Sequence, residues 1–346
     1  MENKNNLMIS ISGIRGIVGH ALTPDKIVEF TSAFARFTGA GRIVIGRDTR
    51  ISGPMVNHLV IGALMASGCD VIDLGIVSTP TVEIMVKHLN ATGGIVITSS
   101  HNPSEWNALK LINNKGMFLS QVQAEKVREF YENKNFKFTE YNQLGSLQLN
   151  NDANDVHIKH ILSKIDVDLI KKKKFKVILD SCNGAGAVIS EKLLKELGCE
   201  VIKLNCSLDK DFPRDPEPIE KNLIKTIEFV KTKKADVCFV QDPDADRLAV
   251  ISGKGVFIGE EYSLVLAAMY FLEKNKGDIV VNVSTSMMID KIAEKFGVKV
   301  FRSRVGEINV SEKMCEVAAV IGGEGNGGVI CPMFHYGRDS LVGRVL

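Results

Sequence analysis

Gly94-Ile95-Val96-Ile97 leads directly into Thr98-Ser99-Ser100-His101-Asn102-Pro103. The short apolar run predicts a buried strand, and the polar cluster closed by a proline predicts a loop at its carboxyl end. In open α/β sheets, ligands bind beyond the carboxyl ends of the strands. We therefore expect Ser100 to lie in a catalytic loop with its hydroxyl exposed. In the alternative interpretation, Ser99, Ser100 and Asn102 only turn the chain through side-chain to backbone hydrogen bonds.

Strands alternate with helices on both sides of this segment. A helix beginning at Pro24 precedes a strand at 42–46, and further helices at 54–67 and 80–89 flank a strand at 71–74. Helices of ten or more residues between strands are crossover connections, which predict a mainly parallel sheet covered on both faces. The same alternation returns twice downstream. We expect an α/β protein of three consecutive similar domains, each with a mixed, mainly parallel sheet covered by helices, at residues 1–150, 151–256 and 257–346.

Composition limits the classes of partner. The chain has 346 residues, 45% of them hydrophobic, which is enough for two or three domains. Its 43 Lys and Arg against 41 Asp and Glu give a net charge of +2, too small to indicate nucleic acid or a membrane surface as partner. No stretch approaches the roughly 20 apolar residues of a membrane span. The seven cysteines show no zinc spacing, which favours free thiols in a reducing cytoplasm.

A second chemical segment is Gln241-Asp242-Pro243-Asp244-Ala245-Asp246-Arg247, which follows the apolar run 237–240. In an extended loop, alternate side chains share a face, so the three aspartates are expected to converge on a divalent cation, with Mg²⁺ the natural choice. A calcium EF-hand is excluded, because Arg247 and Gly253 occupy the positions that require Gly and Glu. Three surface aspartates without a cation would repel one another.

Two glycine-rich segments each contain few charged side chains. Ser10 to Gly19 includes the single cation Arg15, and it could bind an anion or form a plain hairpin. Gly322 to Gly328 follows a strand expected at 318–321 and includes Glu324 and Asn326. Its glycines would let the backbone approach sugar hydroxyls, or it could be a turn without a ligand.

These segments together resemble the α-D-phosphohexomutases. The Ser100 segment is similar to the family's phosphoserine loop, Thr-Ala-Ser-His-Asn-Pro, with Ser99 in place of Ala and with Asn107 and Lys110 at the family's spacing. The aspartate segment resembles the family's magnesium loop, Asp-Gly-Asp-Ala-Asp-Arg, with Pro243 in place of Gly. The Arg15 and Glu324 segments also resemble family segments. The family's fourth, C-terminal domain is not recognised, and we expect it to be absent.

The resemblance implies an isomerase that transfers a phosphoryl group between phosphorylated Ser100 and a phosphosugar through a hexose bisphosphate, which is an intermediate and activator. It also implies a role for each candidate residue. The implied catalytic residues are Ser100, Lys110 as proton carrier, Arg15 and His101. The implied substrate-binding residues are Glu324, Asn326 and Arg247. The implied Mg²⁺ ligands are Ser100, Asp242, Asp244 and Asp246.

Within the family, the segments Trp106 to Lys110, Gly323 to Ile330 and His335 to Asp339 look most like the phosphoglucosamine mutase branch. The substrate would then be hexosamine 6-phosphate and 1-phosphate. A phosphoglucomutase or phosphomannomutase is the first alternative. Two other classes remain open: a phosphatase with Asp242 as nucleophile, and an inactive sugar-phosphate-binding remnant.

Overall fold

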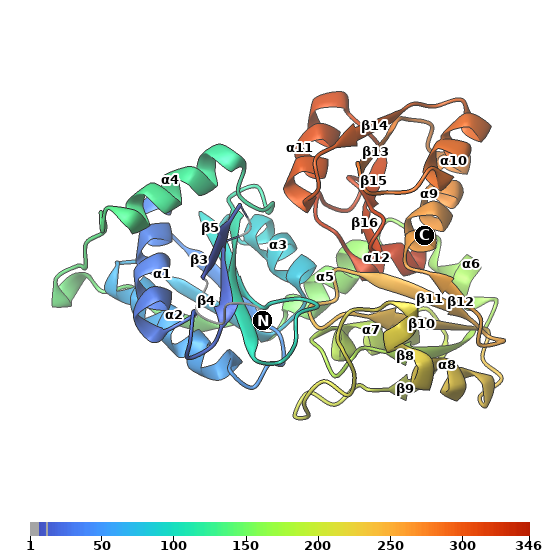
Figure 1. The fold of residues 1–346 in the computed structure, drawn as a ribbon, viewed down its shortest axis with the longest axis horizontal. Helices are drawn as coiled ribbons and strands as arrows, with labels where there is room; N and C mark the ends of the chain where they lie inside the picture. Colours follow the sequence, from blue (N-terminus) through green and yellow to red (C-terminus); the bar gives the residue numbers. More distant parts are fainter. Residues whose placement is uncertain (1–6, 12) are drawn as a thin grey trace. The chain divides into compact units, whose positions relative to one another are not determined.

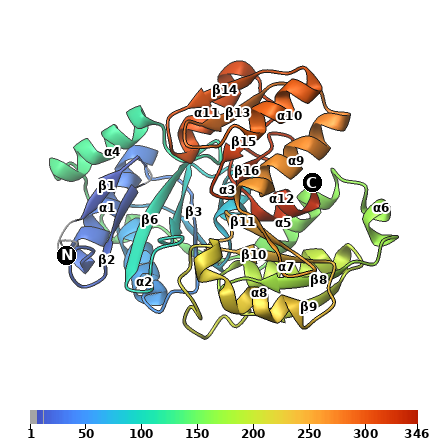
Figure 2. The same ribbon diagram turned by 45° about the vertical axis from the view of Figure 1, so that its right-hand side comes forward.

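The computed structural model describes residues 7–11 and 13–346. It divides into two compact units, residues 1–154 and 155–346. Three mixed sheets organise the chain, one in the first unit and two in the second (Figures 1 and 2). The predicted α/β class is therefore confirmed. The boundary predicted at 256/257 falls inside the second unit, and the three domain boundaries stay predictions.

The first unit is built on a seven-stranded sheet of order β1-β2-β6-β5-β3-β4-β7. Strands β5, β3, β4 and β7 run parallel, and β6, β2 and β1 extend the sheet with antiparallel pairs. The elements are β1 (Met8–Ser10), β2 (Gly13–Ile17), α1 (Pro24–Thr38), β3 (Ile43–Arg47), α2 (Gly53–Ala66), β4 (Val71–Ile76), α3 (Thr79–His88), β5 (Gly93–Ile97), β6 (Trp106–Asn113), α4 (Gln121–Glu132) and β7 (Leu147–Leu149).

Successive side chains of the central strands point to opposite faces of the sheet, and helices cover both faces. Ile43 and Ile45 pack in the core beneath α1 and α2, while α3 covers the opposite face (Figure 1). On that face Gly94 lets α3 approach, because an added Cβ would lie 2.7 Å from the Val86 side chain. Neither β6 nor β7 was expected from the sequence. Strand β6 adds antiparallel pairs with β5 and β2, whereas β7 adds a parallel pair with β4.

The second unit contains a five-stranded sheet of order β12-β11-β10-β8-β9. The helices α7 and α8 cover opposite faces: Leu194 of α7 packs on Val177 and Leu179, and Val230 of α8 packs on the other side of the sheet. The elements are α5 (Ala153–Leu162), α6 (Val167–Lys171), β8 (Lys176–Asp180), α7 (Gly186–Glu196), β9 (Glu200–Leu204), α8 (Ile224–Lys231), β10 (Val237–Gln241), β11 (Leu248–Ser252) and β12 (Phe257–Gly259).

The same unit contains a four-stranded sheet of order β14-β13-β15-β16. Helix α11 covers one face, and α9, α10 and α12 cover the other (Figure 1). The elements are α9 (Glu261–Lys274), β13 (Ile279–Asn282), α10 (Met288–Phe296), β14 (Val300–Ser303), α11 (Glu307–Val317), β15 (Ile321–Glu324), β16 (Gly328–Ile330) and α12 (Ser340–Val345). Strand β15 begins where the predicted strand was expected to end.

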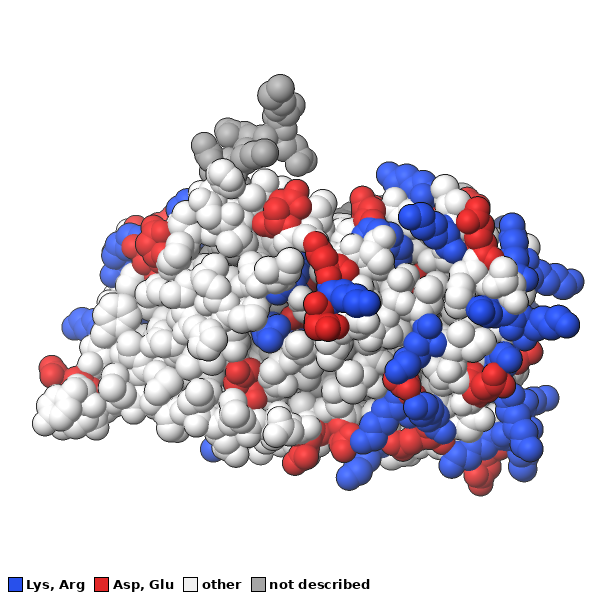
Figure 3. All heavy atoms as spheres, turned by 90° about the horizontal axis from the view of Figure 1, so that it is seen from below, with Lys and Arg blue, Asp and Glu red and all other residues white. Residues whose placement is uncertain are grey.

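The seven cysteines all lie within the described residues and are free thiols. No helix among the described residues is both long and apolar enough to cross a membrane. On the face shown in Figure 3, Lys and Arg side chains are interspersed with Asp and Glu side chains. The prediction that neither nucleic acid nor a membrane surface is the partner continues to rest on this balance of charge.

Candidate active site

Ser100 lies in a tight turn directly beyond the carboxyl end of β5. Its backbone has a φ of +49°, a left-handed conformation that is uncommon for a non-glycine residue. The Ser100 N–H donates to Thr98 Oγ1 at 3.0 Å, and Thr98 Oγ1 donates to Asp48 Oδ2 at 2.6 Å. The turn is therefore fixed by specific contacts. The expectation of an exposed hydroxyl is wrong, because Ser100 is only 2% exposed.

Arg50 holds this turn through its guanidinium, a role that no pattern in the sequence indicated. Its guanidinium Nη2 donates to the carbonyls of Ser100 at 2.6 Å and Asn102 at 2.8 Å, while Nη1 donates to those of Pro103 and Trp106. Its Nε donates to Asp48 at 3.0 Å, and the side chain is fully buried. One planar guanidinium thus donates to four backbone carbonyls between Ser100 and Trp106. In the sequence, the only sign of this role is that Arg50 is a charged residue soon after the strand expected at 42–46.

Three further predicted residues gather around the turn. His101 Nδ1 lies 3.3 Å from Ser100 Oγ, and Arg15 Nη1 donates to Asn102 Oδ1 at 2.8 Å. Arg15 belongs to the hairpin of β1 and β2, as the second interpretation of its segment expected. Lys110 lies on β6, paired with Val96 of β5, and is buried with its Nζ 5.6 Å from the centre of the Phe118 ring. The first unit therefore places two cations and an imidazole on strands or loops that adjoin Ser100.

The aspartate segment of the second unit connects the antiparallel strands β10 and β11. The expectation of an extended loop is wrong: the chain turns, with Ala245 at a φ of +56° and its N–H bonded to the Asp242 carbonyl at 3.1 Å. The predicted convergence is nevertheless present, because Asp242, Asp244 and Asp246 each offer a carboxylate oxygen, all within 4.8 Å of one another. The turn brings the carboxylates together by folding back.

The electrostatics of this cluster fit a divalent cation. All three aspartates are buried. Burial, together with the neighbouring charges of Asp246 and Asp244, raises the pKa of Asp242 well above its usual value. Three hard oxygen donors held together at such a cost are a donor set that Mg²⁺ prefers.

Arg247 follows the cluster and is nearly buried, at 8% exposed. Its guanidinium makes two long ion pairs, from Nη1 to Glu217 at 3.7 Å and from Nε to Asp246 at 3.9 Å. Among the described residues its Nε has no hydrogen-bond partner. Donor groups of Arg247 are therefore available for an anion beside the aspartates.

Glu324 lies at the end of strand β15 and not in a loop as expected. Its Oε1 accepts hydrogen bonds from Asn282 Nδ2 at 2.7 Å and from the Gly306 N–H at 2.9 Å, and its Oε2 accepts one from Arg338 Nη1 at 2.6 Å. Burial disfavours the carboxylate, but the charge of Arg338 and these hydrogen bonds outweigh it and hold the pKa of Glu324 below its usual value. Glu324 is a fixed, ionised group.

The glycines around Glu324 let backbone segments pack closely, a role that was not expected from the sequence. A Cβ on Gly322 would lie 2.2 Å from the Val280 carbonyl oxygen, and one on Gly327 would lie 2.4 Å from that of Leu248. The Leu248 N–H in turn donates to the Gly327 carbonyl at 3.0 Å, so the β15–β16 turn abuts the strand that follows the aspartates. Asn326 lies in this turn with its amide oxygen buried and without a hydrogen-bond partner among the described residues.

Arg338, whose role no sequence motif predicted, joins these groups. Its Nη2 donates to Asp246 Oδ2 at 2.5 Å, its Nη1 to Glu324, and its Nε to Glu307 Oε2 at 3.0 Å. Although burial disfavours the cation, Asp246, Glu324 and Glu307 raise its pKa well above the usual value. The guanidinium therefore links the aspartate cluster to the β15–β16 turn.

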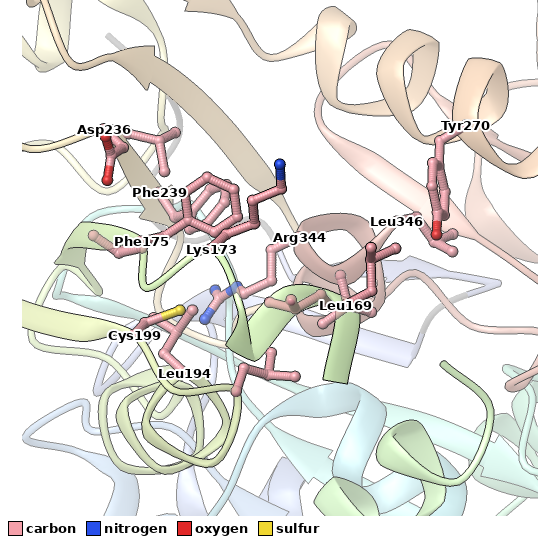
Figure 4. A pocket seen from close by; sticks show the side chains of 15 residues that line it. Leu169, Lys173, Phe175, Leu194, Cys199, Asp236, Phe239, Tyr270, Arg344 and Leu346 are labelled. Atoms are coloured by element: carbon pink, nitrogen blue, oxygen red, sulfur yellow. The ribbon is translucent and has the colours of Figure 1, made fainter. Parts of the chain in front are cut away.

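The second unit also has a cavity of about 480 Å³, lined mainly by apolar side chains of α6, β8, α7, β10 and α12 (Figure 4). The Arg344 side chain extends into it from α12 (Figure 4). None of the site residues predicted from the sequence lines this cavity. It is separate from the aspartate cluster and from Glu324.

Comparison with known proteins agrees with this arrangement. The Phosphoglucomutase/phosphomannomutase alpha/beta/alpha domain I model matches residues 8–138, the domain II model matches residues 155–255, and the domain III model matches residues 259–346. The aspartate cluster lies in the second match and Glu324 in the third. The Ser100 turn lies in the first.

Individual relatives are similar over nearly the whole chain. A phosphoglucomutase/phosphomannomutase of Thermococcus kodakarensis is 41% identical over 337 residues, which are 95% of this chain and 74% of the relative. A protein of Methanopyrus kandleri described as "Probable phosphoglucosamine mutase" is 36% identical over 95% of this chain and 72% of its own length. The crystal structure of a phosphoglucomutase/phosphomannomutase family protein from Burkholderia thailandensis superposes with a TM-score of 0.84 at 27% identity, over 98% of this chain and 76% of that one. The chain belongs to the phosphoglucomutase/phosphomannomutase family.

Proposed function

We propose that this chain is an intramolecular phosphotransferase that interconverts hexosamine 6-phosphate and hexosamine 1-phosphate through phosphorylated Ser100 and a hexose bisphosphate. The observation that carries the proposal is the Ser100 turn. A serine in a left-handed conformation, with its hydroxyl 3.3 Å from His101 and its carbonyl held by Arg50, is a fixed acceptor and donor of one phosphoryl group.

The reaction consists of two phosphoryl transfers. In the first, a sugar hydroxyl oxygen attacks the phosphorus of phosphoserine, the bond from phosphorus to Ser100 Oγ breaks, the hydroxyl proton passes to a neutral Lys110, and Ser100 leaves as an alkoxide. The bisphosphate then turns over, so that its other phosphoryl group faces Ser100. In the second, Ser100 Oγ attacks that phosphorus, the bond from phosphorus to the sugar oxygen breaks, and Lys110 returns the proton to the sugar oxygen. Because the charge of a loose transition state lies on the phosphoryl oxygens, the protein must chiefly position and neutralise that group.

The remaining residues divide this work between them. Arg15, His101 and Arg247 would donate to phosphoryl oxygens, and Arg247 has donors available for this role. Asp242, Asp244 and Asp246, with an oxygen of phosphorylated Ser100, would hold Mg²⁺. Bound Mg²⁺ supplies positive charge to the transferring phosphoryl group. Glu324 and Asn326 would bind ring hydroxyls of the sugar, and the buried amide oxygen of Asn326 has an acceptor position for one.

The choice of hexosamine among the family's sugars rests on resemblance to the phosphoglucosamine mutase branch, which includes the Methanopyrus kandleri relative. Glucose and mannose phosphates are the alternative substrates, in keeping with the Thermococcus kodakarensis relative. The seven cysteines are free thiols, which fits a reducing compartment, and we assign the chain to the cytoplasm.

Intact-mass measurement of the purified protein tests the proposal. We expect one phosphate on the parent chain after incubation with hexose bisphosphate and none on Ser100→Ala. Ser99→Ala is the matched control. The Ser99 hydroxyl donates to Asn102 Oδ1 and is expected to be dispensable for phosphorylation. A phosphate that persists in Ser100→Ala but disappears in Asp242→Asn would instead support a phosphatase with Asp242 as nucleophile.

Turnover is measured separately, with glucosamine 6-phosphate, glucose 6-phosphate and mannose 6-phosphate as substrates and Mg²⁺ and hexose bisphosphate present. Formation of glucosamine 1-phosphate at the highest kcat/KM supports the hexosamine assignment. A higher kcat/KM for glucose or mannose phosphate would transfer the assignment to that sugar while leaving the phosphoserine chemistry intact.

A further inference from the structure

Arg338 forms one hydrogen-bonded junction between three elements of the second unit. Its guanidinium contacts Asp246 after β10, Glu307 at the first turn of α11, and Glu324 at the end of β15. A second hydrogen bond, from the Arg338 N–H to Glu307 Oε1 at 2.9 Å, fixes the backbone at the same point. The separations along the sequence are 92, 31 and 14 residues. One side chain therefore determines how these carboxylates lie relative to one another.

Gly328 provides the space that this side chain occupies. A Cβ on Gly328 would lie 2.2 Å from Arg338 Cδ and 2.9 Å from its Cγ, closer than any real contact. The φ of Gly328 is not positive, so no backbone strain requires a glycine there. The glycine is thus matched to the arginine, which identifies the junction as a specific feature of this site.

We propose that Arg338 is a positioning residue that couples the metal-binding aspartates to Glu324. The affinity for Mg²⁺ then depends on the ion pair between the Glu324 carboxylate and Arg338. The proposal rests on the proposed function, because it takes Asp246 as a metal ligand and Glu324 as a sugar ligand. A donor bound to Asp246 Oδ2 fixes the orientation of the carboxylate, as outer-shell partners of metal ligands do. Reciprocally, bound Mg²⁺ would favour the observed position of Glu324.

Charge alone predicts the opposite result, and this contrast makes the inference testable. A cation beside a cation site repels the metal, so simple removal of Arg338 would mix a gain from charge with a loss of position. Variants that keep the charge separate the two. Arg338→Lys keeps one positive charge but loses the planar fork, and Gly328→Ala displaces the arginine without changing any charge.

The experiment measures the Kd for Mg²⁺ by calorimetry on the full chain, with Tm and circular dichroism to confirm folding. We expect Arg338→Lys and Gly328→Ala each to weaken Mg²⁺ binding about 10-fold to 100-fold. Lys291→Arg is the control: Lys291 pairs with Glu294 on the exposed side of α10 in the same unit and should leave the Kd unchanged. If one variant fails to fold, the other still decides the outcome.

A double-mutant cycle tests the coupling itself. Glu324→Gln should change the Mg²⁺ Kd at least fivefold in the parent chain and leave it nearly unchanged in the Arg338→Lys background. Unchanged or tighter Mg²⁺ binding in either variant that folds, or additive effects in the cycle, would overturn the inference. Failure of the parent chain to bind Mg²⁺ would overturn the proposed metal site, a result distinct from these.

Discussion

The guanidinium of Arg50 donates a 2.6 Å hydrogen bond to the backbone carbonyl of Ser100, 50 residues away in sequence. The same group satisfies three more carbonyls of the loop and pairs with Asp48, so the Ser100 turn is assembled on a buried cation. A left-handed serine is uncommon and requires support from its surroundings. Arg50 supplies that support.

Arg50→Lys should therefore uncouple the loop from the sheet. A lysine ammonium has three donors and no planar fork, so it cannot satisfy four carbonyls and Asp48 together. We expect a loss of about 2–4 kcal/mol in the free energy of unfolding, within the range for broken buried pairs, and a large fall in phosphate incorporation at Ser100. Urea unfolding and intact mass measure the two effects. Arg47→Lys is the matched control, because Arg47 Nη1 makes one hydrogen bond to the Asp48 carbonyl; an equal effect of both substitutions would contradict a special role for Arg50.

Asp244→Asn tests the aspartate cluster. The substitution keeps the shape of the side chain and removes one of three buried carboxylates that meet within 4.8 Å. We expect weaker Mg²⁺ binding by at least tenfold and a fall of orders of magnitude in phosphoryl transfer. Since a ligand that binds only the folded state raises stability, Mg²⁺ should raise the Tm of the parent more than that of the variant.

The control for this experiment is Asp236→Asn, an exposed aspartate of the same unit that caps the Lys176 N–H. It should respond to Mg²⁺ as the parent does. If Asp244→Asn keeps the parent's Mg²⁺ affinity and transfer rate, the three aspartates are not the metal site.

Acid should destabilise the chain partly through Asp339. Its Oδ2 lies 2.9 Å from His157 Nε2 and 3.2 Å from His335 Nε2, and its Oδ1 accepts the Leu341 N–H at the start of α12. Burial disfavours the carboxylate, but the charge of His157 and the hydrogen bonds of both histidines outweigh it and hold the pKa of Asp339 well below 3.8. A lowered folded-state pKa means that this contribution is fully present above the unfolded value and is lost as the pH falls below it.

Asp339→Asn should therefore cost about 3 kcal/mol or more at neutral pH, as the loss of a buried charged partner does. The difference in unfolding free energy between parent and variant should shrink as the pH falls below about 4. Chemical unfolding at a series of pH values measures it. A difference that does not change with pH would show that Asp339 acts only as the helix cap.

The alternation of apolar runs and helical patterns was sufficient to predict three mixed sheets covered by helices, because each strand and helix is specified by residues close in sequence. Segments without such a pattern were missed. The strand β6, for example, carries Asn107 and Lys110 on a buried sheet, and its apolar content alone did not distinguish it from the loop before it. The motifs around Ser100 and Asp242 were found because their residues are consecutive.

The residues that organise the site could not be predicted in this way. Arg50 acts on carbonyls about 50 residues away and Arg338 on Asp246, 92 residues away, so only the folded chain brings the partners together. Glu324 was expected in a loop because glycines surround it. In the structure those glycines allow close approach of backbone segments, and the carboxylate ends a strand.

Arg344 is a charged residue whose loss should stabilise the chain. Its guanidinium lies 5.5 Å from the centre of the Phe239 ring, and its three nitrogens are buried without a hydrogen-bond partner among the described residues (Figure 4). Burial lowers the pKa of Arg344 to about 10. Because the charged form is disfavoured in the folded state, it subtracts from stability at neutral pH.

Arg344→Leu should therefore raise the free energy of unfolding by about 1–3 kcal/mol, the usual range for an unsatisfied buried polar group, and fill part of the apolar cavity around it. For a unit of this size the Tm should rise by roughly 2–4 °C per kcal/mol. Scanning calorimetry at pH 7 measures the change, and Lys291→Leu, which breaks an exposed ion pair with Glu294, should leave the Tm nearly unchanged or lower it slightly. The parent's deficit should also shrink as the pH approaches 10, since deprotonation of Arg344 relieves the buried charge. A lower Tm for Arg344→Leu than for the parent would show that contact with the Phe239 ring outweighs the cost of the buried cation.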